Sequence, residues 1–90
     1  MTPAVDSTQI DITVLYFSVL REKLGRSSEQ VSLESGASGA DLLDKLSKAN
    51  RIISEYRSVI RLAINTAYAR ETQQLSAGDE VAIITPVSGG

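Results

Sequence analysis

Apolar and polar residues alternate in the stretch IDITVLYF, residues 10–17. Every second residue, ending at Tyr16, is apolar, which is the period of a strand with one buried face. The alternation then fails, because Leu15 and Phe17 fall on the side of Asp11. The end of this predicted strand is therefore apolar on both faces, and one of the two is left over for something other than the core.

Two short elements follow this first predicted strand. The stretch SVLREKLG (18–25) is typical of a helical turn that Gly25 closes. The stretch EQVSL (29–33) predicts a second strand, which pairs most simply with the first as a hairpin. The stretch ESGASG (34–39) is typical of a loop.

A helical period appears in the middle of the chain. Apolar residues recur there with the spacing of one helix face: Leu42, Leu46, Ala49 and Ile53. Ser38 suits the N-cap position, and Asp41 follows three residues on, as in a capping box with the shorter acid. We expect a main helix over 39–50 and a second, short helix over 52–59.

Strand patterns return in the last third of the chain, at 61–65, 67–70 and 80–85. Asn65 and Thr66 suit a tight turn between the first two of these strands. Gly78 and Asp79 suit a turn before the last strand.

This order of elements predicts one α+β domain of the β-grasp kind, a mixed sheet of about five strands with a helix packed on one face. If the first and last strands are neighbours, they must run parallel, because a helix connects them. We expect a flexible leader at 1–9, the domain at 10–85 and a flexible tail at 86–90.

The amino-acid composition limits the chemistry that the side chains can carry out. The chain has 90 residues and a formal net charge of −2, and it contains no cysteine and no histidine. Disulfides, thiol nucleophiles and thiolate metal sites are thereby excluded, and so is the commonest general base. Basic residues are interleaved with acidic ones, which argues against nucleic acid as a partner. No apolar run is long enough for a membrane span and no signal peptide is recognisable, so a cytoplasmic carrier or binding protein is expected.

The sequence ends in ITPVSGG. Pro86 lacks a backbone donor and is expected to end the pairing of the last strand. Gly89 and Gly90 suit a place where side chains are excluded, such as a narrow channel of a partner enzyme, and the reactive group there would be the Gly90 carboxylate. Activation as an acyl-adenylate would make that carboxylate open to attack by sulfur or nitrogen. The alternative is a frayed terminus that happens to hold two glycines.

Three stretches carry a resemblance to a known family: VLYFSVLREKLG, AINTAYA and LSAGDEVAIITPVSGG. They resemble the MoaD-like sulfur carriers, the small subunits of molybdopterin synthase. The last stretch is the most diagnostic, because it combines a Gly-Asp-Glu turn, a strand and the Gly-Gly end in fixed spacing. One departure is Thr85, which stands before Pro86 where the family usually has a second proline and so restores a backbone donor.

The resemblance implies a ubiquitin-like fold and a non-catalytic, sulfur-donating role. It implies that an E1-like activating enzyme adenylates Gly90 with ATP and magnesium, and that a sulfurtransferase supplies the sulfur for a thiocarboxylate. The loaded tail would then enter the large subunit of molybdopterin synthase and donate sulfur to cyclic pyranopterin monophosphate, in a heterotetramer. The resemblance implies no permanently bound cofactor or metal.

The left-over apolar face has a use in such a carrier. Phe17, Ala82 and Ile84 are expected on the side away from the helix, with Tyr68 beside them, and family members dock partners through matching positions. The tail residues that would follow the face into the partner are Pro86, Val87 and Ser88. The alternative is that Phe17 and Tyr68 are tucked under a loop.

Other functions share parts of this pattern. A carrier for thiamine synthesis or tRNA thiolation, or a protein modifier, would use the same tail chemistry. A ubiquitin-like interaction module with an inert tail would use only the face.

Overall fold

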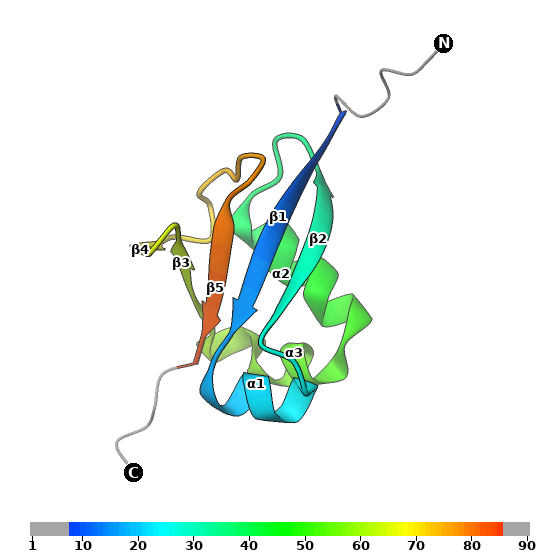
Figure 1. The fold of residues 1–90 in the computed structure, drawn as a ribbon, viewed down its shortest axis with the longest axis vertical. Helices are drawn as coiled ribbons and strands as arrows, with labels where there is room; N and C mark the ends of the chain where they lie inside the picture. The colour runs from blue at the N-terminus through cyan, green and yellow to red at the C-terminus, as the bar shows by residue number, and fades with distance from the viewer. Residues whose placement is uncertain (1–7, 86–90) are drawn as a thin grey trace.

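Five strands form one mixed sheet in the order β2-β1-β5-β3-β4 (Figure 1). The computed structural model describes residues 8–85. The strands are β1 (Gln9–Tyr16), β2 (Ser28–Glu34), β3 (Arg61–Ile64), β4 (Ala67–Ala69) and β5 (Glu80–Ile84). The central pair, β1 and β5, is parallel, and every other neighbouring pair is antiparallel. The β-grasp prediction and the parallel first and last strands are confirmed.

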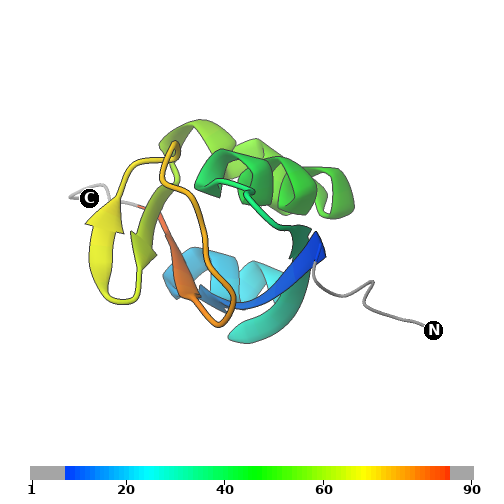
Figure 2. The ribbon, with the colours of Figure 1, turned by 90° about the horizontal axis from the view of Figure 1, so that it is seen from above.

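The helices are α1 (Ser18–Leu24), α2 (Gly39–Ala49) and α3 (Arg51–Tyr56), followed by the 3-10 turn η2 (Arg57–Val59). Figure 2 shows α2 and α3 side by side on one face of the sheet, and α1 lies at the end where β1 and β5 both finish (Figure 1). The helix predicted over 52–59 is therefore split into α3 and η2. Asn50 caps α3, because its Oδ1 accepts from the backbone N–H of Ile52 at 3.0 Å.

The local signals read from the sequence have the expected geometry. Ser38 Oγ accepts from Asp41 N at 3.3 Å and Asp41 Oδ2 accepts from Ser38 N at 2.9 Å, which completes the capping box at the start of α2. Gly25 closes α1 in the left-handed region, at φ 74°. Asn65 and Thr66 both have positive φ at the turn between β3 and β4.

The core lies between the sheet and the two helices that cover it. Strand register places Val14 beside Val81 and Tyr16 beside Ile83 in the parallel pair, and all four side chains are buried. They belong to one apolar cluster with the buried residues of the helices: Leu20, Leu42, Leu43, Leu46 and Ile53. One face of the sheet is therefore fully used by the core.

Most predicted strand and helix ends were wrong by one residue, and two of these differences lie at the edge of the sheet where β1 and β5 finish. The first strand ends at Tyr16, and Phe17 is the N-cap of α1 in extended conformation. The chain turns at Ser18, which has a φ of 51°. The last strand ends at Ile84, with Thr85 following it.

Candidate functional site

The face of the sheet away from α2 carries a row of small and apolar residues. The strand register aligns Leu15 with Ala82, Ala82 with Ala63, and Ala63 with Tyr68, across four neighbouring strands. Tyr68 is 75% exposed, and Leu15 and Ala82 are half-buried. We call the apolar half of this face, which consists of Leu15, Phe17, Ala63, Tyr68, Ala82 and Ile84, the exit patch.

Phe17 and Ile84 extend the exit patch to the end of the sheet. Because β1 and β5 are parallel, their last residues lie at the same edge. Phe17 is 42% exposed and Ile84 is half-buried. Neither Phe17 nor Tyr68 is tucked under a loop, so that alternative is wrong, and both are available to a partner.

The other half of the same face is polar. Ser32 Oγ donates to Asp11 Oδ1 at 2.6 Å, and Gln30 Nε2 donates to Thr13 Oγ1 at 2.8 Å, both between β2 and β1. The open face therefore has a polar half, between β2 and the first part of β1, and an apolar half, the exit patch. The exit patch lies next to the end of β5.

The predicted reactive end of the chain follows Thr85 in the sequence. Thr85, the last described residue, is 8% exposed and is therefore packed into the fold. The tail candidates lie outside the described residues, and their predicted roles stay predictions: Pro86, Val87, Ser88, Gly89 and Gly90.

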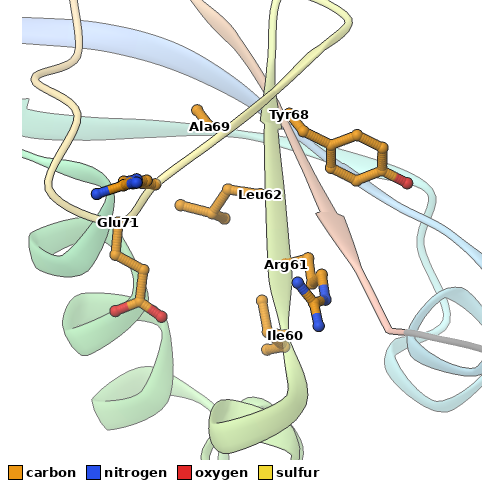
Figure 3. Close-up of a pocket in the computed structure, with 7 residues that line it drawn as sticks. Ile60, Arg61, Leu62, Tyr68, Ala69 and Glu71 are labelled. Atoms are coloured by element: carbon orange, nitrogen blue, oxygen red, sulfur yellow. The ribbon is translucent and has the colours of Figure 1, made fainter.

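An open depression of about 570 Å³ lies along β3 and the segment that contains β4. Figure 3 shows Arg61 and Tyr68 on one side of β3, and Ile60 and Leu62 on the other. Ile60 and Leu62 are core residues, and the exposed Arg61 begins β3. The sequence alone did not place Arg61 or Ala63 on the open face, because only the register of β3 with β5 does so.

A partly buried hydrogen bond between two side chains lies just before Phe17 in the sequence. The Tyr16 hydroxyl donates to Glu29 Oε2, and Arg26 Nη1 donates to Glu29 Oε1 at 2.9 Å. Burial, reinforced by the bond to the Glu29 carboxylate, raises the pKa of Tyr16 above its ordinary value of 10.0. Tyr16 is thus held neutral, and it ties the end of β1 to the start of β2.

The part of the chain that the structure describes contains neither a candidate metal site nor a candidate membrane-spanning helix. No group of three or more acidic side chains within residues 8–85 could hold a metal ion. No helix in the same range is long and apolar enough to cross a membrane.

Comparison with known proteins assigns the chain to a family. The ThiS family profile matches residues 14–90. A molybdopterin synthase sulfur carrier subunit of Chlamydomonas reinhardtii is 37% identical over 83 residues, which cover 90% of this chain and 100% of that protein. The corresponding subunit of Arabidopsis thaliana is 34% identical, over 94% of this chain and 88% of that protein.

Solved structures agree with the fold. SAMP1 from Haloferax volcanii superimposes with a TM-score of 0.76 at 29% identity, covering 89% of this chain and 99% of that one. A chain in the complex of subunits 1 and 2 of the molybdopterin-converting factor of Helicobacter pylori gives a TM-score of 0.65 at 17% identity, covering 90% of this chain and 100% of that one, a likeness of fold alone. With a sheet of ubiquitin-like order, an apolar patch where its last strand ends and a family match that runs through Gly90, this chain belongs to the ThiS family and is related over most of its length to molybdopterin synthase sulfur carrier subunits.

Proposed function

We propose that this protein carries sulfur as a thiocarboxylate on Gly90 and donates it within a molybdopterin synthase. The observation that supports this most directly is the family match through Gly90, together with relatives that are sulfur carrier subunits of that enzyme. The chain contains no cysteine, so it has no thiol on which to hold sulfur. The Gly90 carboxylate is the group we assign to that task.

The proposed loading has two steps. An oxygen of the Gly90 carboxylate attacks the α-phosphorus of ATP on the activating enzyme, and magnesium pyrophosphate leaves. A hydrosulfide-level nucleophile, delivered by a sulfurtransferase, then attacks the carbonyl carbon of the acyl-adenylate. AMP leaves with the electron pair of the broken C–O bond, and the thiocarboxylate remains.

The described part of the protein contributes binding, not acid–base chemistry. The exit patch lies at the end of β5, so a partner that covers it would receive the following residues directly. Burying one large apolar side chain there contributes about 1.5–3 kcal/mol, so three together would supply much of the binding free energy of a micromolar complex before association costs. In this proposal the partners are the large subunit, where cyclic pyranopterin monophosphate accepts the sulfur, and the activating enzyme.

A second function shares the same geometry. SAMP1 from Haloferax volcanii, whose fold matches at 29% identity, is a small archaeal modifier protein. A modifier would pass the activated Gly90 carbonyl to an amine instead of to sulfur. The two functions therefore differ in the nucleophile that meets the acyl-adenylate.

Reconstitution of the reaction in vitro distinguishes a sulfur carrier from a protein modifier. The full chain is incubated with the cognate activating enzyme, ATP, magnesium and a sulfur source, and then with the large subunit and cyclic pyranopterin monophosphate. The proposal expects molybdopterin from the full chain and none from a variant that lacks Gly89 and Gly90. Both proteins should unfold at the same denaturant concentration, because the core cluster lies within the described residues.

Failure of the loaded chain to produce molybdopterin would contradict the proposed function. Isopeptide-linked adducts on lysines in place of the thiocarboxylate would favour the modifier. A chain without the two glycines that still supports synthesis would contradict the role of the tail.

A further inference from the structure

A cation lies at the edge of the exit patch. Arg61 begins β3 and alternates with the buried Leu62, so it points to the open face, on the side of Tyr68 (Figure 3). Its Cα partner across the ladder is Ile84, the last residue of β5. A charged side chain therefore lies next to the apolar residues that a docking partner would cover.

Arg61 has no partner among residues 8–85. Its guanidinium makes no hydrogen bond or ion pair there. Three other arginines in the same range are paired with carboxylates at 2.9 to 3.7 Å: Arg26, Arg51 and Arg57. The side chains of Arg21 and Arg70 likewise have no partner in this range, and what singles out Arg61 is its place opposite Ile84, at the edge of the exit patch.

The polar half of the face shows the contrast. Asp11, Thr13, Gln30 and Ser32 bond one another between β1 and β2. Lys45 Nζ, from α2, donates to the backbone oxygen of Ser32 at 2.6 Å and so occupies an acceptor of the outer strand. The side chains of these four residues are thus bonded within the polar half, whereas Arg61 is not bonded within the described residues.

Docking on the exit patch would take the Arg61 guanidinium out of water. A guanidinium that is buried without a counter-charge is strongly unfavourable, and one that meets a carboxylate in a bidentate pair is favourable and directional. We propose that the large subunit that docks here places an Asp or Glu carboxylate opposite Arg61. This inference rests on the proposed function, which supplies the partner, and adds the chemistry by which that partner is recognised.

The ion pair between Arg61 and the facing carboxylate would contribute more to the choice of partner than to the affinity for it. A surface with an apolar residue at that position would fit Leu15, Tyr68 and Ile84 but leave the guanidinium unpaired, so it would be rejected. Arg61 would therefore discriminate between large subunits, or between this partner and other proteins that cover apolar faces of β-grasp carriers.

Binding of the cognate large subunit to single variants tests this. Calorimetric titration at low and high salt compares the wild type with Arg61→Leu, Arg61→Lys and Arg61→Glu. The matched control is Lys48→Glu, which makes the same charge change at an exposed position of α2, behind the sheet. Because Arg61 is exposed, these changes should not alter the fold, and circular dichroism melting checks this.

We expect Arg61→Leu to weaken binding about tenfold or more and Arg61→Glu to weaken it further, as for loss of one side of a buried charge pair. Arg61→Lys should retain part of the affinity, and Lys48→Glu should stay within about twofold of the wild type. The salt dependence of the wild type should shrink in Arg61→Leu. Changing the facing Asp or Glu of the large subunit to Arg should restore binding to Arg61→Glu.

Two outcomes are distinguishable. If the wild type binds the large subunit and Arg61→Leu binds equally well or better, this inference is overturned and the proposed function stands. If the wild type does not bind the large subunit at either salt concentration, the proposed function falls, and this inference with it.

Discussion

Replacing Tyr68 should separate an effect on partner binding from an effect on stability more clearly than replacing any other residue of the exit patch. Tyr68 is 75% exposed, on the short strand β4, with Ala63 as its cross-strand partner. A tyrosine presents roughly 200 Å² to solvent when fully exposed, so about 150 Å² remains to be covered by a partner. At about 25 cal/mol per Å², covering half of that contributes about 2 kcal/mol to binding.

The same arithmetic gives a small cost for folding. Only about 50 Å² of the Tyr68 side chain is already covered, which corresponds to about 1 kcal/mol of stability. Tyr68→Ala should therefore raise the dissociation constant for the large subunit about 30-fold. It should lower the Tm by only about 4–8 °C.

The assay is calorimetric titration of the large subunit, with urea unfolding of each variant alone. Gln30→Ala is the matched control, since Gln30 is exposed on the polar half of the same face and bonded to Thr13. It should bind within about twofold of the wild type. If Tyr68→Ala binds as tightly as the wild type, or if Gln30→Ala is weakened as much, the exit patch is not the docking surface.

Three further predictions concern Phe17, Gly39 and Tyr16. Phe17→Ala should weaken binding and also cost about 2–3 kcal/mol of stability, because more than half of this side chain is already covered at 42% exposure. Urea unfolding beside titration would show both effects, and unchanged stability would mean that Phe17 does not pack at the start of α1. Gly39→Ala should destabilise the fold by about 1–2 kcal/mol, since the overpacking exceeds the gain in helix propensity. A Cβ there would lie 2.5 Å from Leu62 Cδ1 and 3.2 Å from the Glu71 carbonyl oxygen, and a stabilised variant would refute that contact. Tyr16→Phe should lower stability near neutral pH, where the bond to Glu29 is intact. Because the pKa of Tyr16 is raised in the folded protein, its contribution to the free energy of unfolding is full below about pH 10 and is lost as the pH rises further. The stabilities of the two proteins should therefore converge in alkaline unfolding measurements, and a constant difference between them would contradict the assignment.

Local periodicity was sufficient for most of the fold. The alternation at 10–17, the stripe through Leu42 and Leu46, and the cap at Ser38 each depend on residues close in sequence, and the structure confirms all three. The parallel pairing of β1 with β5 followed from connectivity, because a helix lies between them.

Features that depend on contacts between distant residues could not be read in this way. Gly39 was expected where the loop meets the main helix, with no packing role, yet it lets α2 approach Leu62 and the backbone of Glu71. Phe17 continued the strand pattern, but Ser18 turns the chain with a positive φ. Arg61 had no assigned role until the register with Ile84 placed it at the edge of the exit patch.

The candidate site was only partly predictable for the same reason. Phe17, Tyr68 and Ile84 were expected together because each is apolar on the uncovered side of its strand, and their exposure agrees. Ala63 was not expected, because a small residue gives no pattern of its own and only the ladder from Ala82 to Tyr68 reveals its place.

The most direct test of the account is the mass of the C-terminal peptide. The full chain is incubated with the cognate activating enzyme, ATP, magnesium and a sulfur source, and intact-protein and peptide masses are recorded. The account predicts the gain of one sulfur-for-oxygen exchange, confined to the peptide that contains Gly90 and dependent on ATP. An unchanged mass with an active enzyme, or a gain located elsewhere in the chain, would contradict it.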